Sequence, residues 1–451
     1  MFELQMSYSD RLHEVIPGGA HTYSRGDDQY PSNAPQILDH GKGAYVWDPY
    51  GNKFLDYGMG LRSVTLGYDH DRVSNAAIAE IRKGNNLTRA SMTELMAAEL
   101  MVSLFPWAEQ VKFAKNGSTV TTAAVKLARA YTGRKFVAIC AEHPFFTYDD
   151  WFIGTTFMDK GVPDENKELS LKFSYNNIDS LDLLFVKFPG QIACVIMEPA
   201  TYVSPCKNEG SQITDKKGCA NEMNFLREVS EACKKEGAVF ILDEMITGFR
   251  WDLHGAMKMY GIEPDLATFG KGMANGFALA GLIGKKEIME LGGIRNEGEE
   301  RVFLISTTHG SEMSAFGAFI ETVRIYQELD VCGHLWNYGR KLMNGLNEIA
   351  RGLGIEKHFA VQGFACSPYY FARDQKGNIS AEFRTLWSQE LIKNGVLMPW
   401  IALSNAHGDA ELKLTLNAAE KALGVYKNAL HDGVSKYLVG PAIKPVFRKY
   451  N

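Results

Sequence analysis

Residues 238–272 read AVFILDEMITGFRWDLHGAMKMYGIEPDLATFGKG, and this stretch decides the fold class that we predict. It begins with an apolar run typical of a buried strand, which ends on Asp243. A second strand-like run, DLATF at 265–269, leads into Lys271, which lies between two glycines. In open α/β sheets the chemistry gathers beyond the carboxyl ends of the strands. The stretch therefore predicts parallel strands with reactive side chains at one edge of a sheet.

The rest of the chain continues this alternation. Short apolar runs predict buried strands at 136–140 (FVAIC) and at 192–197 (IACVIM), and Glu198 follows the second run directly. Segments with a helical period lie between such runs, for example at 121–131 and 222–236. The pattern predicts an α/β fold with a largely parallel central sheet.

Both ends of the chain differ from this middle part. The N-terminal part is rich in turns, and residues 48–51 predict a hairpin turn between two half-buried strands within 45–57. A long helix begins near Phe316, and a mixed α+β segment follows it. We expect the tail at 433–451 to lie along the surface, where a partner subunit is one candidate to contact it.

The composition is that of an ordinary soluble globular protein of 451 residues, 45% of them hydrophobic and 22% charged. A net charge of −5 gives no electrostatic reason to expect nucleic acid as a partner. The N-terminus lacks the basic start and apolar run of a secretory signal, and no apolar stretch approaches the roughly 20 residues that span a bilayer. We therefore expect no membrane association and a cytoplasmic location.

The seven cysteines are scattered and include no Cys-x-x-Cys pair, so they indicate neither a disulfide framework nor a zinc site. Cys140 and Cys194 fall in apolar runs and are expected to be buried thiols. Cys206 and Cys219 flank a polar loop, where a disulfide is possible but is not the state that we favour.

Lys271 and Asp243 are the residues to which we assign the chemistry. Desolvation makes a lysine in a tight, glycine-flanked turn a nucleophile for a carbonyl. A buried aspartate needs a cation as its partner, and a protonated pyridine nitrogen is one. The alternatives are a solvated turn lysine and an aspartate that caps a helix or forms an ion pair.

Two further features support a phosphate-bearing, planar ligand. Residues 116–119 (NGST) precede a helix, and small residues with hydroxyls at a helix N-terminus form an anion site, although a plain N-cap is the alternative. Phe145 and Phe146 offer an aromatic face for a planar ring, although adjacent phenylalanines are more often core. His143 has no second histidine at metal-binding spacing, so we assign no metal.

With these residues in view, the chain resembles the class III aminotransferases, and among them the glutamate-1-semialdehyde aminomutase branch. The resemblance runs over roughly 8–430 and includes WDPYGNKFLDYG, KNGSTVTTAAVKLAR, VIMEPA, LDEMITGFR, DLATFGKG and ISTTHGSE. It implies pyridoxal 5'-phosphate as cofactor, fold type I, and a homodimer with active sites at the interface. It also implies three parts: an N-terminal segment (1–75) contributing to the small domain and the interface, a large cofactor-binding domain (76–315), and a small α+β domain with the tail (316–451).

The resemblance also implies a role for each site residue. Lys271 would be the Schiff-base lysine, Asp243 the partner of the pyridine nitrogen, and Glu198 a neighbour of the ring hydroxyl and the lysine. Gly117 and Ser118 would form the phosphate loop.

The remaining assignments concern the faces of the ring, the second subunit and the substrate. Met245 would pack on one face of the ring, and Phe145 or Phe146 would stack on the other. Thr307 or Thr308, of which Thr307 fits the spacing better, would reach the phosphate of the neighbouring subunit. Arg25 would bind a substrate carboxylate; its alternative is a surface arginine in a loop.

The departures from the family pattern fall around the substrate. The sequence has HPFFTYDDW at 143–151 in place of a tyrosine-histidine-glycine, and MANGFALAG at 273–281 in place of a triple-glycine stretch. It also has WIALSNAH at 400–407 in place of an acidic segment. They argue against the tetrapyrrole-pathway mutase itself. They favour a relative with another amino acceptor, such as a sugar or a secondary-metabolite intermediate.

We therefore predict transamination from an amino acid donor, glutamate, to an aldehyde or ketone. Lys271 would act as general base, and the guanidinium of Arg25 would hold the donor carboxylate by two bonds. An aminomutase that moves the amino group within one molecule is the alternative. A decarboxylase or lyase on the same fold, and a non-enzymatic member, are further rivals; the last would normally lack the lysine or the aspartate.

Overall fold

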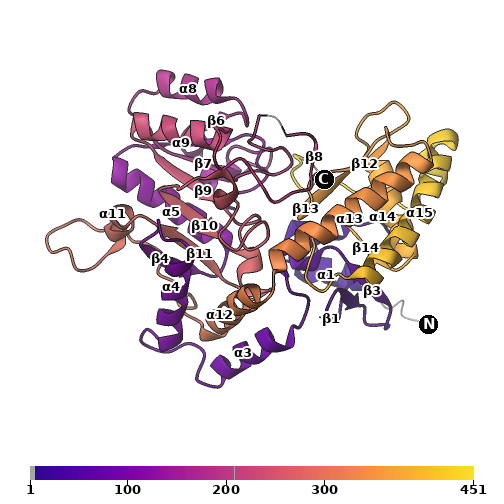
Figure 1. Cartoon of the computed structure of the whole chain (residues 1–451), viewed down its shortest axis with the longest axis horizontal. Helices are drawn as coiled ribbons and strands as arrows, with labels where there is room; N and C mark the ends of the chain where they lie inside the picture. Colours follow the sequence, from indigo (N-terminus) through magenta and orange to yellow (C-terminus); the bar gives the residue numbers. More distant parts are fainter. Residues whose placement is uncertain (1–5, 208, 451) are drawn as a thin grey trace. The chain divides into compact units, whose positions relative to one another are not determined.

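The protein is described by a computed structural model, which covers residues 6–207 and 209–450 (Figure 1). The chain divides into two compact units. The larger unit contains Ser63–Thr65, Asp71–Gly333 and the residues from Lys449 on. The smaller unit contains the residues up to Arg62, Leu66–His70 and His334–Arg448. The division into 1–75, 76–315 and 316–451 stays a prediction.

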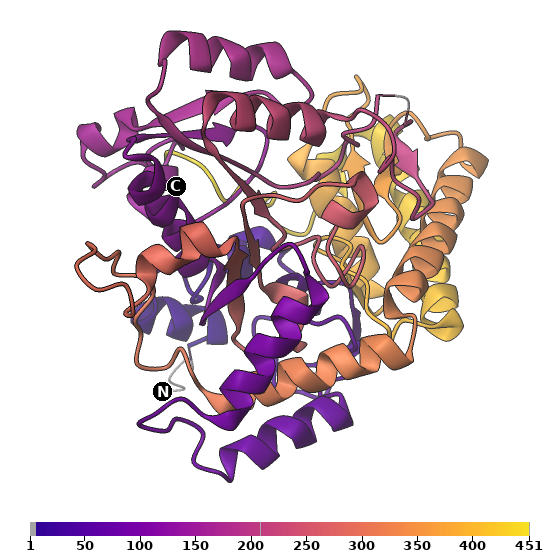
Figure 2. The same ribbon diagram turned by 60° about the vertical axis from the view of Figure 1, so that its left-hand side comes forward.

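The larger unit is built on a seven-stranded sheet (Figure 2) with the strand order β4-β11-β10-β9-β7-β5-β6. Its strands are β4 (Gln110–Ala114), β5 (Phe136–Cys140), β6 (Ser170–Phe173), β7 (Ile192–Met197), β9 (Val239–Asp243), β10 (Leu266–Phe269) and β11 (Ala280–Gly284). Strand β11 is antiparallel to both of its neighbours, and the other neighbouring pairs are parallel. The predicted α/β fold with a largely parallel sheet is confirmed.

The central strands are apolar because both faces of the sheet are covered. Every residue of β5, β7 and β9 is buried, as expected of parallel strands with helices on both faces. The strands predicted at 136–140 and 192–197 have these bounds, and the one predicted at 238–242 lies one residue later.

Helices of the larger unit surround this sheet. They are α3 (Asp71–Ile81), α4 (Met92–Leu104), α5 (Gly117–Thr132), α6 (Asp150–Ile153), α7 (Asp164–Glu168), α8 (Ile178–Lys187), α9 (Phe225–Glu236), α10 (Met257–Tyr260), α11 (Lys286–Met289) and α12 (Met313–Glu328). Short elements are β8 (Gln212–Ile213), η3 (Lys271–Ala274) and η4 (Glu290–Gly292). Helix α5 contacts β4, β7, β9, β10 and β11 and is therefore positioned by the sheet itself.

Side-chain caps fix where helices α5 and α9 begin. The side chain of Asn116 accepts a hydrogen bond from the backbone N–H of Thr119 at 2.9 Å, which starts α5 at Gly117. Asn224 does the same for Arg227 at 3.2 Å. The helix predicted from residue 222 therefore begins at Phe225, after its cap.

The smaller unit contains a sheet in the order β1-β2-β3-β14 and an antiparallel pair, β12 and β13. Its strands are β1 (His40–Lys42), β2 (Tyr45–Trp47), β3 (Lys53–Asp56), β12 (Phe359–Phe364), β13 (Ser367–Ala372) and β14 (Val396–Leu397). Its helical elements are α1 (Tyr8–Val15), η1 (Tyr23–Arg25), η2 (Asp27–Gln29), α2 (Met59–Arg62), α14 (Ala381–Lys393), α15 (Asp409–Asp432) and η5 (Val434–Lys436), with α13 (Val331–Gly352) contributing most of its length.

The predicted hairpin is confirmed in the smaller unit. Strands β2 and β3 pair in antiparallel fashion, with Tyr45 opposite Leu55. The Asp48 carboxylate accepts hydrogen bonds from the backbone N–H groups of Tyr50 (3.0 Å) and Asn52 (2.9 Å), and Gly51 takes a φ of +83°. These contacts make the turn that joins the strands.

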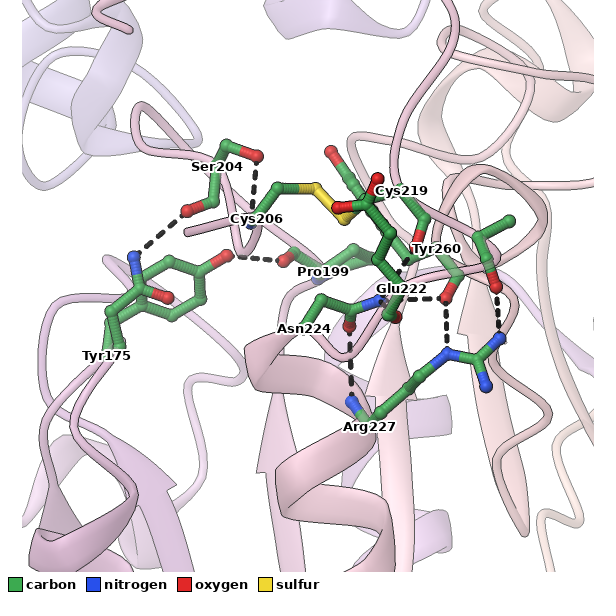
Figure 3. The surroundings of a disulfide bond; sticks show 11 residues. Tyr175, Pro199, Ser204, Cys206, Cys219, Glu222, Asn224, Arg227 and Tyr260 are labelled. Atoms are coloured by element: carbon green, nitrogen blue, oxygen red, sulfur yellow. Dashed lines mark hydrogen bonds between the residues drawn. A yellow bond between two sulfur atoms is a disulfide. The ribbon is translucent and has the colours of Figure 1, made fainter. Parts of the chain in front are cut away.

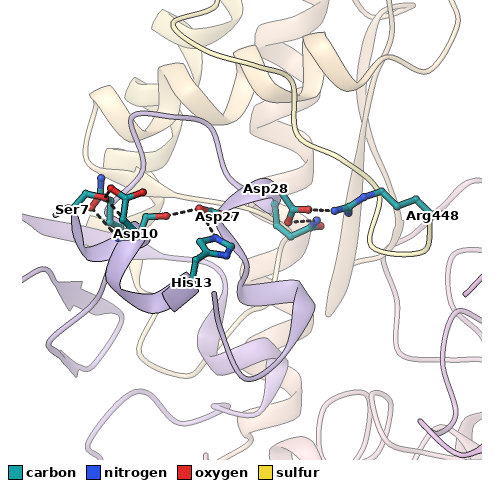
Figure 4. A network of polar contacts seen from close by, with 9 residues as sticks. Ser7, Asp10, His13, Asp27, Asp28 and Arg448 are labelled. Carbon is teal, nitrogen blue, oxygen red and sulfur yellow. Dashed lines mark hydrogen bonds and ion pairs between the residues drawn. The ribbon is translucent and has the colours of Figure 1, made fainter. Parts of the chain in front are cut away.

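The C-terminal tail lies against the smaller unit, as predicted. The backbone N–H of Val439 donates to Oε1 of Gln389, and that of Ile443 donates to Oγ1 of Thr385, both at 2.9 Å. Arg448 forms an ion pair with Asp28 at 2.5 Å, close to the polar contacts around α1 (Figure 4). Packing of the tail on a partner subunit stays a prediction.

The cysteines correct one expectation. Cys206 and Cys219 form a disulfide with a Cα–Cα distance of 6.2 Å (Figure 3), whereas the sequence did not favour this pairing. The loop is brought together by anchors that spacing does not reveal: Asn176 donates to the carbonyl of Ser204, and Asn224 donates to that of Cys219. Cys140 and Cys194 are buried free thiols, as predicted.

Across the described residues, no helix combines the length and the apolar character needed to cross a membrane.

Candidate active site

Asp243 and Lys271 leave neighbouring parallel strands at the same edge of the sheet. Asp243 is the last residue of β9 and lies opposite Thr268 of β10. Its Oδ1 accepts hydrogen bonds from the backbone N–H of Met245 and from the hydroxyl of Thr268, both at 3.0 Å. Lys271 opens η3, two residues after β10 ends. The fold thus gathers the two residues that lie 28 positions apart in the sequence.

The Asp243 carboxyl group has little contact with solvent. The residue is only 2% exposed, and this burial raises the pKa of Asp243 to about 6, while the positive charge of Lys271 acts in the opposite direction. A carboxylate placed here is stabilised by a nearby cation because water is excluded. The site therefore favours a cationic group against Asp243.

Two glycines and a methionine form a close-fitting wall beside this pair. A Cβ atom on Gly270 would lie 2.6 Å from Sδ of Met245, and one on Gly117 would lie 3.0 Å from the same sulfur. The Met245 side chain therefore packs between the turn before Lys271 and the start of α5. Lys271 itself has a φ of +40°, which is uncommon for a residue other than glycine.

The start of α5 supplies backbone N–H groups for an anion. Gly117 and Ser118 are its first residues, and the first N–H groups of a helix have no partner within the helix. The side-chain oxygen of Ser118 accepts a hydrogen bond from the backbone N–H of Tyr148 at 3.2 Å. The N-terminal end of α5 is therefore tied to the loop that follows β5.

That loop places its two phenylalanines differently. Phe146 is 2% exposed, its carbonyl accepts a hydrogen bond from Thr121 at 2.9 Å, and its ring meets that of Phe152 edge to face at 5.6 Å. Phe145 is 45% exposed. Phe146 therefore belongs to the core, whereas Phe145 is accessible to a ligand.

Glu198 follows β7 directly and is 3% exposed. Its backbone N–H donates a hydrogen bond to Nδ1 of His143 at 3.0 Å. Burial lowers the pKa of His143 to about 3, so the ring is neutral at ordinary pH. The sequence drew attention to His143 only as a metal ligand, because the bond to Glu198 joins segments far apart in the chain.

Thr307 and Thr308 belong to the larger unit, and Arg25 belongs to the smaller unit. The two threonines are exposed in the loop before α12, where the carbonyl of Thr308 accepts a hydrogen bond from Asn86 at 3.1 Å. Arg25 lies in η1 of the smaller unit, where its charge acts to lower the pKa of Tyr30 against a larger rise due to burial. Their predicted functions stay predictions.

Comparisons with known proteins identify one family of enzymes. The sequence model of the family described as Aminotransferase class-III matches residues 28–363. A 3-aminobutyryl-CoA aminotransferase from Cloacimonas acidaminovorans (strain Evry) is 28% identical over 429 residues, covering 94% of this chain and 98% of the relative. A glutamate-1-semialdehyde 2,1-aminomutase from Persephonella marina (strain DSM 14350 / EX-H1) is 30% identical, covering 86% of this chain and 90% of the relative.

Solved structures are similar over almost the whole chain. The PLP internal aldimine form of the FumI protein from Sphingopyxis sp. MTA144 has a TM-score of 0.82 and 26% identity, covering 94% of this chain and 97% of that one. A transaminase with PLP bound has a TM-score of 0.80 at 21% identity, covering 94% and 97%, and this likeness concerns the fold alone.

Proposed function

This chain belongs to the class III aminotransferases, enzymes of fold type I that use pyridoxal 5'-phosphate, and on that premise we propose that it carries the amino group of glutamate to an aldehyde or ketone. A sugar or secondary-metabolite intermediate is the proposed kind of acceptor. The observation that carries the proposal is the buried Asp243 beside Lys271 at the carboxyl edge of β9 and β10. This pair supplies a cation-binding carboxylate and an amine in one place.

The residues around the pair fit the cofactor. The Asp243 carboxylate suits its cationic ring nitrogen, because burial strengthens the preference for a positive neighbour. The first turn of α5, at Gly117 and Ser118, suits its phosphate. Met245 and the exposed Phe145 are proposed for the two faces of its ring, and Phe145 is preferred to Phe146 because Phe146 is core.

The catalytic roles follow from these positions. When bound, pyridoxal phosphate supplies an electron sink that stabilises negative charge on the substrate carbon. Asp243 keeps the ring nitrogen positive, and Nζ of Lys271 takes up and returns the proton of that carbon. Glu198 is proposed to lie beside the ring hydroxyl. Arg25 is proposed to bind the donor carboxylate through its planar guanidinium.

Two copies of the chain are proposed to form a homodimer. The exposed loop that carries Thr307 and Thr308 supports this, since hydroxyls there are free to meet a phosphate held by a second subunit.

A cytoplasmic location is also proposed. The disulfide argues against it because most cytosolic thiols stay reduced, and a thiol count on freshly isolated protein tests the point.

An aminomutase is the second candidate function. The 30% identical relative from Persephonella marina supports it, because that protein is named as a mutase. Both functions use a lysine and an aspartate in the same way. They differ in whether a separate amino donor is consumed.

The deciding experiment adds glutamate to the holoenzyme without any acceptor. We expect one equivalent of 2-oxoglutarate per subunit, together with loss of the visible absorption of the bound cofactor. Lys271→Ala should abolish both. Lys285→Ala is the control and should abolish neither, because Lys285 forms an ion pair with Asp265, which precedes β10, whereas Lys271 follows that strand. Unchanged absorption in cofactor-loaded protein would reject glutamate as the donor and favour the mutase.

A further inference from the structure

His143 makes a hydrogen bond that joins the exits of two neighbouring strands. The residue follows β5, Glu198 follows β7, and the two strands are parallel neighbours. His143 is 4% exposed, and its Nδ1 accepts the backbone N–H of Glu198 at 3.0 Å. Both partners are buried, so water does not compete for this bond.

The hydrogen bond determines which ring nitrogen carries the proton. Because Nδ1 accepts a hydrogen bond from an N–H group, it carries no proton of its own, and the proton of the neutral ring is on Nε2. The rings of Tyr175 and Phe146 pack around the His143 imidazole, with distances between ring centroids of 5.3 and 6.1 Å. Burial among these rings also disfavours the charged form, in which Nδ1 could not accept.

The other ring nitrogen argues against a purely structural role. Nε2 of His143 is buried and has no hydrogen-bond partner among the described residues. A buried donor without a partner costs stability, because it lost its bond to water on folding. Stability alone therefore does not explain a histidine here.

We propose that His143 is a positioning residue for transamination. Its unprotonated Nδ1 holds the backbone of Glu198, and this bond fixes where the buried Glu198 carboxylate lies relative to the bound cofactor. The proposal rests on the proposed function, in which Glu198 lies beside the cofactor ring. A shift of that backbone would move the carboxylate and leave Asp243, at the end of β9, and Lys271, at the start of η3, in place.

The test compares His143→Asn with His143→Phe in the cofactor-loaded protein. The side-chain oxygen of asparagine can take the place of Nδ1 as acceptor, whereas phenylalanine keeps the ring and has no acceptor. We expect His143→Phe to lower the maximal rate constant of the half-reaction with glutamate roughly 10- to 100-fold, with little change in the glutamate concentration that gives half of that rate, and His143→Asn to stay within about threefold of the wild type. The pH midpoint of the cofactor's visible absorption should shift in His143→Phe only.

Two results would overturn the proposal: full activity in His143→Phe, or equal losses and equal absorption shifts in both variants. Thermal unfolding of the apoproteins shows whether each variant folds. If His143→Phe does not, His143→Ala with and without added imidazole replaces it, and restoration of the absorption midpoint by imidazole is then expected. If the wild type itself releases no 2-oxoglutarate, the proposed function fails, and the absorption midpoint still tests His143.

Discussion

At the scale of single residues, Asp243 shows how burial prepares a group for its ligand. The carboxyl sits at the end of an apolar strand and is held by the N–H of Met245 and the hydroxyl of Thr268. These two donors favour the charged form, but burial outweighs them and raises the pKa of Asp243 to about 6. A cationic ring nitrogen would reverse that balance and pull the pKa down again.

Cofactor affinity should therefore depend on pH through Asp243. Below a pKa of about 6 the carboxyl is protonated and neutral, so attraction to a positive ring nitrogen is lost. We expect the Kd for pyridoxal phosphate to rise as pH falls below about 6, by up to about tenfold per pH unit. Fluorescence titration of the apoprotein from pH 5 to 8 measures this.

Asp243→Asn provides the control, because its side chain does not titrate. The variant should bind the cofactor weakly throughout and lose the part of the pH dependence due to this carboxyl, leaving only that of the cofactor's own groups. Identical pH profiles for wild type and variant would show that Asp243 does not carry the effect.

At the scale of elements, the site forms where the start of α5 meets the turn after β10. Met245 lies between them, and its sulfur is the atom that a methyl group on either Gly117 or Gly270 would meet first. The backbone at Gly270 is extended, so alanine is conformationally acceptable there and only the contact with Met245 opposes it.

Gly270→Ala should therefore be destabilising in a way that depends on Met245. We expect a loss of about 1–3 kcal/mol in the free energy of unfolding, as for other overpacked sites. Met245→Val removes the sulfur, so the same alanine should cost clearly less in the double variant. Denaturant unfolding of the four apoproteins measures this coupling, and strictly additive effects would contradict it.

The loop after Glu198 should depend on its disulfide for stability. Cys206 and Cys219 are 13 positions apart, and a loop of this size restricts the unfolded chain by about 3 kcal/mol. The double variant Cys206→Ser/Cys219→Ser should lose stability of that order or less. Dithiothreitol should lower the unfolding temperature of the wild type and leave that of the double variant unchanged.

A matched control is Cys194→Ser, which replaces a buried free thiol and keeps the disulfide. It should remain sensitive to dithiothreitol. Insensitivity of the wild type to the reductant would mean that the bridge contributes nothing to folding.

The elements that could be predicted from the sequence share one property, namely that their signal is local. The apolar runs at 136–140 and 192–197 gave the bounds of β5 and β7 because both are buried along their whole length. Asp243 was found because it interrupts such a run. The start of α9 was misplaced because Glu222 and Met223, before the cap Asn224, continue the helical pattern without being helical.

The parts that could not be predicted depend on contacts between distant segments. The bond from Glu198 to His143 spans 55 positions, and the loop closed by the disulfide is held by hydrogen bonds from Asn176 and Asn224. The antiparallel direction of β11 likewise leaves no trace in its composition. The roles of Thr307, Thr308 and Arg25 rest on resemblance, since no local pattern marks them.

At the scale of the whole molecule, the C-terminal tail is bound to the smaller unit by hydrogen bonds with α14. Gln389 is fully buried, its Nε2 donates to the carbonyl of Tyr437, and its Oε1 accepts from the backbone of Val439. The tail therefore supplies the donor for Oε1 of Gln389 in α14, whereas Nε2 also donates to Oε1 of Glu390.

A chain that ends at Leu438 should consequently unfold more easily. Loss of the bonds from Val439 and Ile443 leaves buried acceptors on Gln389 and Thr385, at a cost of about 1–3 kcal/mol each. Arg448→Ala is the matched control, because it keeps the tail and removes side-chain contacts at its end, namely the ion pair with Asp28 and the hydrogen bond to the carbonyl of Pro445; it should cost about 1 kcal/mol or less. Equal unfolding temperatures for truncated and full-length protein would contradict this role of the tail.

The way the smaller unit is assembled also has a consequence for synthesis on the ribosome. Strand β3 pairs with β14, and Asp28 binds Arg448 of the tail, so these N-terminal residues meet these partners only after the residues in between have been made. The sheet of the larger unit is encoded between them and is complete by Gly284. The sheet of the larger unit can thus form during translation, whereas β3 must wait for β14 to leave the ribosome before the sheet of the smaller unit is complete.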